Sequence, residues 1–167
     1  MSYFFREATQ ADLPEIVAIY NSTIAARSST ADLQPVSVAQ RQAWFDVHGG
    51  SRPIYVLAES SGCIAAWGSF SDYYPRRAYH ISAEISIYVR QEQRGGGLGA
   101  QLLENMLAAA PKLGIRNVLA VVFAHNQASI ALFERFGFQT WGRLPQVCDL
   151  ETKLADIVIL GKCLETV

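Results

Sequence analysis

Cysteine is scarce in this chain of 167 residues, and so are long apolar runs. Cys63, Cys148 and Cys163 lie far apart and form no CxxC pair, which argues against a disulfide framework or a zinc site and for reduced thiols in the cytoplasm. No apolar run approaches the roughly 18 residues that a membrane-spanning helix requires, so no membrane partner is expected. The first residues carry no basic segment followed by an apolar one, so no signal peptide is expected.

Charge is also limited. Only 17% of the residues are charged and the net charge is −1, which argues against nucleic acid or an anionic membrane as the main partner. The length predicts a single domain over residues 1–167. A chain of this size buries roughly 70% of its unfolded surface, so it needs neither a metal nor a disulfide to fold.

The apolar periodicity predicts an alternation of strands and helices. Strands are expected at Tyr3–Ala8, Ile54–Glu59, Cys63–Phe70, Tyr79–Val89, Asn117–Phe123, Phe138–Leu144 and Asp156–Leu160. Helices are expected after Thr9 and Asp12, from Ser37 to Val47, from the glycines at 95–99 to Pro111, and from Asn126 to Arg135. This order predicts one α/β (α+β) domain on a mixed, mostly antiparallel sheet of about seven strands. Tyr79–Val89 and Asn117–Phe123 form its central parallel pair.

The segment Arg94–Ala100 holds four glycines between a strand and a helix. Backbone amides at a helix N-terminus lack partners and lie at the positive end of the dipole, so the segment predicts a phosphate site. A Walker loop is excluded because no Lys-Ser or Lys-Thr follows a glycine. The spacing of Gly95, Gly97 and Ala100 fits a dinucleotide loop, but the next strand ends without the required acidic residue. A plain flexible turn is the remaining alternative.

Two sequence motifs narrow the choice among these kinds of phosphate-binding turn. Arg94, Gly97 and Gly99 fit the pattern [Q/R]xxGx[G/A], and Asn126–Phe138 matches a second signature at the right distance downstream. With these motifs the chain resembles the GCN5-related N-acetyltransferase (GNAT) superfamily. The resemblance implies the GNAT fold, a parallel strand pair splayed around acetyl-CoA as co-substrate, no metal, and a homodimer. Arg76–Tyr79 and Ala83–Val89 are most similar to the phosphinothricin and methionine sulfoximine acetyltransferase group.

The resemblance also implies roles for single residues. The acetyl-CoA site would comprise Ile87, Tyr88, Val89, Arg94, Gly95, Gly96, Gly97, Leu98, Gly99, Ala100, Asn126 and Ser129. Arg76 and Tyr79 would hold the substrate, and Glu84 would act as general base. The strand pattern alone leaves Glu84 open as a base or as a solvated or salt-bridged sheet residue. That pattern places His80 on the strand face of Glu84, where it either lines the substrate pocket or is a surface histidine.

Three residues depart from the resemblance. Phe133 stands where many family members have a tyrosine that protonates the leaving thiolate, so another group or water does this, or the thiolate leaves unprotonated. Leu150 and Leu154 stand where the phosphinothricin group has a lysine and a tryptophan.

The expected function is acetyl transfer from acetyl-CoA to the amine of a small, carboxylate-bearing molecule such as an amino acid or an analogue. The alternatives are a non-catalytic acyl-CoA-binding domain and an acetyltransferase acting on a protein N-terminus or lysine.

Overall fold

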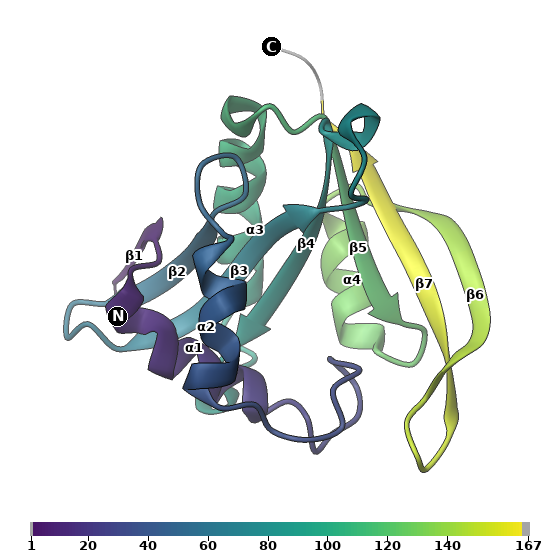
Figure 1. Ribbon diagram of the computed structural model, residues 1–167, viewed down its shortest axis with the longest axis horizontal. Helices are drawn as coiled ribbons and strands as arrows, with labels where there is room; N and C mark the ends of the chain where they lie inside the picture. The colour runs from purple at the N-terminus through teal and green to yellow at the C-terminus, as the bar shows by residue number, and fades with distance from the viewer. Residues whose placement is uncertain (1, 165–167) are drawn as a thin grey trace.

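The computed structural model describes residues 2–164 as one mixed sheet covered by helices on both faces (Figure 1). The strands are β1 (Tyr3–Glu7), β2 (Ile54–Glu59), β3 (Ile64–Asp72), β4 (Ser82–Val89), β5 (Asn117–Phe123), β6 (Gln139–Asp149) and β7 (Leu154–Cys163). The α-helices are α1 (Leu13–Asn21), α2 (Val38–Asp46), α3 (Leu98–Ala109) and α4 (Gln127–Arg135). The sheet has seven strands in the order β1-β2-β3-β4-β5-β7-β6, which confirms the predicted fold class.

Two apolar layers hold the helices on the sheet. On one face, Ile16, Ile19 and Tyr20 of α1 pack with Trp67, and Trp44 and Phe45 of α2 pack against this cluster. On the other face, the core joins α3 and α4 to the central strands; among its members are Leu102, Leu103, Met106, Ile85, Val118, Val122 and Phe133. Figure 1 shows α1 and α2 in front of the sheet and α3 and α4 behind it. The chain between α1 and α2 therefore lies on the face opposite α3.

The central strands β4 and β5 run parallel but stay paired over a short length. The pairs are Ser82 with Asn117, Ala83 with Val118 and Glu84 with Leu119. Beyond Glu84, β4 remains paired with β3 as far as Val89, while β5 remains paired with β7. The sheet therefore opens between its two central strands, as expected of a pair splayed around a ligand.

Most predicted elements are confirmed, including the Ser37 cap, whose hydroxyl accepts from the Gln40 amide at 3.1 Å. The predicted strand Tyr79–Val89 begins too early, because Arg77–Tyr79 form a 3-10 turn in which His80 N donates to Arg77 O. The last two strands are longer than predicted, since β6 and β7 continue as a twisted ribbon on either side of residues 150–153. The three cysteines are free thiols.

Candidate active site

The glycine turn between β4 and α3 ends in a helix start without a side-chain cap. Gly95 and Gly97 adopt φ angles of +80° and +82°, a region that side chains with a Cβ rarely enter. Gly97 is the N-cap of α3 and has no side chain that could accept a hydrogen bond from the first amides of the helix. The first amides of α3 are therefore left for an external acceptor, and the helix dipole favours an anion there. A Cβ on Gly95 or Gly97 would meet no atom within 4 Å, so the turn faces open space.

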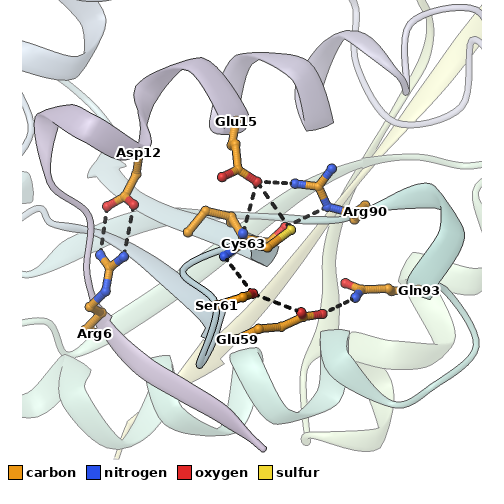
Figure 2. Close-up of polar contacts among 9 residues, drawn as sticks. Arg6, Asp12, Glu15, Glu59, Ser61, Cys63, Arg90 and Gln93 are labelled. Carbon is orange, nitrogen blue, oxygen red and sulfur yellow. Dashed lines mark hydrogen bonds and ion pairs between the residues drawn. The ribbon is translucent and has the colours of Figure 1, made fainter. Parts of the chain in front are cut away.

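A polar network fixes the chain just before this turn (Figure 2). Arg90 donates from Nε to the carbonyl of Ile64 at 2.7 Å and pairs with the Glu15 carboxylate. Gln93 donates from Nε2 to Glu59 Oε1 at 2.7 Å. These contacts anchor residues 90–93 to α1 and to the β2–β3 hairpin. Sequence reasoning missed Glu15 and Glu59, because nothing local marks a partner 75 or 34 residues away.

A cavity of about 640 Å³, here called the donor cavity, extends from the glycine turn to the opening between β4 and β5. All the residues predicted to contact acetyl-CoA line it except Gly96, which belongs to the same turn. Residues that were not predicted line it as well: Thr23, Ser28, Ser29, Gln93, Ala128, Ala131, Leu132, Phe133 and Arg135. The donor cavity thus combines an anion-binding end with an elongated, largely apolar body.

The edge of β4 inside this opening has no partner strand beyond Glu84. The amide of Arg90 donates to the carbonyl of Ala65, on the β3 side. Backbone groups of a strand alternate in direction, so those of Ile87 and Val89 point the other way, into the gap left by β5. Arg94 Nε donates to the Val89 carbonyl at 3.2 Å, which agrees with this direction. An extended chain carrying amides can pair with this edge as an additional strand.

A second cavity of about 250 Å³, here called the acceptor cavity, contains Glu84. Its walls come from β4, β5 and β7 and from residues 28–31 between α1 and α2. Glu84 forms no hydrogen bond or ion pair with another residue of the range 2–164, so it is not the salt-bridged sheet residue that the pattern left open. Burial raises the pKa of its carboxyl. A carboxylate without a partner, with a raised pKa and in a cavity, is suited to accept a proton.

Long-range contacts hold residues 28–31 over the acceptor cavity. Arg27 donates to Leu33 O at 2.9 Å and pairs with Glu151, beyond β6, at 3.1 Å. Asn126, the N-cap of α4, accepts from Ser129 N at 3.1 Å and donates to Ser28 O at 2.8 Å. The α1–α2 connection is therefore tied both to the helix that lines the donor cavity and to the β6–β7 ribbon.

The predicted substrate residues lie apart from this cavity. Arg76, Tyr79 and His80 are exposed in the chain that leads into β4, and none of them lines the donor or the acceptor cavity. The prediction that His80 shares a strand face with Glu84 is wrong, because His80 caps the 3-10 turn and its Nδ1 lies 2.8 Å from Arg77 O. The guanidinium of Arg76 lies 5.9 Å from the ring centre of Tyr74.

The two cavities meet along a set of shared residues, here called the seam: Ser28, Ser29, Ile87, Tyr88, Asn126, Ser129 and Phe133. A donor bound in one cavity and an acceptor bound in the other would come together at the seam.

No group of three or more His, Cys, Asp or Glu residues within the range 2–164 is placed to hold a metal ion. Among the same residues, no helix has the length and apolar character needed to span a membrane.

A glycine turn with free helix amides, a strand edge without a partner strand and a half-buried carboxylate are the arrangement expected of a transferase that uses acetyl-CoA as the acyl donor. The sequence model of the Acetyltransferase (GNAT) family matches residues 16–138. The chain belongs to this family and is an N-acetyltransferase. Both the family and the enzyme class predicted from the two motifs are confirmed.

Individual relatives agree over nearly the whole length. YwnH of Bacillus subtilis is 47% identical over 157 residues, 94% of this chain and 96% of that protein. An L-methionine sulfoximine/L-methionine sulfone acetyltransferase of Pseudomonas aeruginosa is 39% identical over 88% of this chain and 86% of its own. The crystal structure of a GNAT superfamily phosphinothricin acetyltransferase from Sinorhizobium meliloti in complex with AcCoA superposes with a TM-score of 0.91 at 28% identity, covering 98% and 89% of the two chains.

Proposed function

We propose that this enzyme acetylates the amino group of a small molecule of amino-acid size, with Glu84 as the general base. The observation that carries the proposal is the seam, where the donor cavity meets the acceptor cavity that contains Glu84. The acceptor cavity of about 250 Å³ is large enough for a small amine, and residues 28–31 form one of its walls. A cavity of this size favours a small molecule over a protein chain as the acceptor.

The donor side is organised by backbone groups. The amides at the start of α3 would bind the pyrophosphate of acetyl-CoA, and Arg94 would add a positive charge beside it. The free edge at Ile87 and Val89 would pair with the two amides of the pantetheine arm, with Asn126 and Ser129 alongside. This arrangement directs the thioester carbonyl to the seam, where an amide of β4 polarises it.

Glu84 acts on the acceptor. Most primary amines are protonated at neutral pH and cannot attack a carbonyl until a proton is removed. The Glu84 carboxylate takes that proton directly or through water, and the nitrogen lone pair then forms the bond to the thioester carbon. As the C–S bond breaks, its electron pair leaves with sulfur, and the nitrogen loses its second proton to water. The products are the N-acetylated amine and CoA.

Arg76 is proposed to hold a carboxylate of the acceptor. None of the described residues that line the acceptor cavity is basic, so an acidic substrate needs a cation from outside it. Arg76 and Tyr79 line neither cavity and lie on the chain that leads into β4, six and three positions before the first residue of that strand. Arg76→Ala is expected to raise the KM of an amino acid tenfold or more and to leave the KM of an amine without a carboxylate unchanged. The matched control is Arg77→Ala.

The names of the relatives suggest where to begin the search for the amine. They include acetyltransferases of methionine sulfoximine and methionine sulfone and an L-amino acid N-acyltransferase from Escherichia coli that is 30% identical. Release of free thiol from acetyl-CoA, followed across amino acids, sulfone and sulfoximine analogues, phosphinothricin and polyamines, tests the proposal directly. Turnover confined to polyamines or to peptide amines would refute an amino-acid-like acceptor.

A homodimer in the cytoplasm is proposed for the intact protein. Four exposed apolar side chains belong to β6 and β7, the last two strands in the order of the sheet: Trp141, Leu144, Val147 and Leu154. Such an edge suits pairing with a second copy. Light scattering on the purified protein should give twice the 18.4 kDa chain mass, and a monomer at micromolar concentration would refute the dimer. The free thiols fit a reducing compartment, which cell fractionation can test.

A further inference from the structure

The departing sulfur of CoA needs a partner that the family resemblance does not supply here. Phe133 faces both cavities from α4, where it packs edge-on against Phe138 with the ring centres 5.0 Å apart. A phenylalanine cannot donate a hydrogen bond. A hydrogen bond to the negative charge that develops on sulfur would therefore come from another residue of the seam or from water.

The seam offers few candidates. Ile87 and Phe133 have no polar hydrogen on the side chain. Asn126 uses its amide for the carbonyl of Ser28 and its oxygen for the amide of Ser129. The hydroxyls of Ser28, Ser29, Ser129 and Tyr88 remain. Of these, Tyr88 carries its hydroxyl on a ring that the buried residues Trp67 and Tyr20 hold in place.

Tyr88 is also the most rigidly held of these residues. Its ring stacks on Trp67 with the centres 4.6 Å apart and meets Tyr20 edge-on at 5.3 Å. Trp67 and Tyr20 are both buried, so the phenol is clamped between β3 and α1. The Tyr88 hydroxyl forms no hydrogen bond with any other residue of the range 2–164, although the residue lines both cavities. A rigid, unpartnered donor at the seam is preorganised for a group that arrives there.

We propose that the Tyr88 hydroxyl donates a hydrogen bond to the sulfur of CoA as the C–S bond breaks, in place of the donor that Phe133 lacks. The inference rests on the proposed function. The electron pair of the C–S bond goes to sulfur, the amine proton is on Glu84, and no proton is transferred at Tyr88. The thiolate, with a pKa of about 8.5, leaves as an anion and takes up its proton from water. Burial raises the pKa of Tyr88, which keeps the hydroxyl protonated as a donor throughout the working pH range.

The test is Tyr88→Phe, measured in single-turnover reactions with enzyme in excess over acetyl-CoA, so that product release does not hide the chemical step. The rate is expected to fall by about 10- to 100-fold while the KM for acetyl-CoA changes less than about twofold, because the interaction exists only when charge develops on sulfur. The matched control is Tyr55→Phe. Tyr55 lies on β2, its ring stacks on Phe5 of β1, and it lines neither cavity. This control should retain the wild-type rate.

A second variant separates chemistry from packing. Tyr88→Phe combined with Phe133→Tyr restores a hydroxyl on the opposite wall of the seam, and the double variant should be faster than Tyr88→Phe alone. A structural defect at position 88 would not respond to this change. A Tyr88→Phe rate within twofold of wild type, a loss confined to KM, or a double variant no faster than the single one would overturn the proposal. A wild-type enzyme that acetylates no small amine would instead refute the proposed function.

Discussion

Replacing Glu84 by glutamine should lower the activity of the enzyme and raise the stability of its fold at neutral pH. The amide keeps the size of the side chain and removes only its charge, so a rate loss measures the base. An amine with a pKa of about 8 is roughly one-tenth free at pH 7 and nine-tenths free at pH 9. Since a positioned general base contributes about 10²- to 10⁴-fold, we expect kcat/KM to fall at least 100-fold at pH 7. About tenfold of this loss in kcat/KM should be regained at pH 9, because most of the amine is already unprotonated there and needs no base.

The same variant should be more stable than wild type at neutral pH. Burial raises the pKa of Glu84 in the folded protein above its value in the unfolded chain. Stability from this group is complete below the unfolded pKa and is lost as the pH rises through the folded pKa. Glu84→Gln should therefore melt higher than wild type at pH 7 and at the same temperature near pH 4.

Two measurements decide this prediction. Thiol release against pH gives the rates, and thermal melts at both pH values give the stabilities; one kcal/mol corresponds to about 2–4 °C in a chain of this size. A Glu84→Gln enzyme with the wild-type kcat/KM at pH 7 would remove Glu84 from the mechanism. A lower melting temperature at pH 7 would show that the ionised carboxylate stabilises the fold, against the burial argument.

Three further variants test the framework of the site. Gly68→Ala places a Cβ 2.7 Å from the carbonyl oxygen of Ser86 and 2.6 Å from Met106 Sδ. Denaturant titration should therefore show a free energy of unfolding lower by about 1–3 kcal/mol. An unchanged midpoint would contradict close packing at Gly68. Asp12→Asn breaks a pair in which Arg6 holds the pKa of Asp12 below its usual value. Stability from that pair is present above the unfolded pKa and is lost as the pH falls through the folded pKa, so the deficit of about 1.5–3 kcal/mol at pH 7 should shrink in acid. Asn126→Ala removes the cap of α4 and the hydrogen bond to the carbonyl of Ser28. The free energy of unfolding should fall by about 1 kcal/mol, and the KM for acetyl-CoA should rise. A KM equal to that of wild type would show that the hydrogen bond to Ser28 does not shape the donor cavity.

The sequence predicts the strand, turn and helix of the donor side, because their determinants are local. A strand, positive-φ glycines and a helix start follow one another within Val89–Ala100, and their chemistry depends on the backbone alone. The acceptor side depends on contacts between distant segments. Arg27 with Glu151 and Asn126 with Ser28 each join residues about 100 or more positions apart, and no periodicity marks them. Alternation at Tyr79 and Ile81 imitates a strand, although the amide of Tyr79 bonds within a turn, to Arg76 O.

Leu150 and Leu154 lie at different depths in the structure. Leu154 is 56% exposed at the start of β7, whereas Leu150 is fully buried and packs with Phe123 and Ile157. Phe123 and Ile157 line the acceptor cavity, and Leu150 does not. With the amine bound in the acceptor cavity, as proposed, Leu150 would act on it only through the walls that it supports. Because none of the described residues that line this cavity is basic, its shape would select the side chain of the amine, and recognition of a carboxylate would depend on a cation outside it.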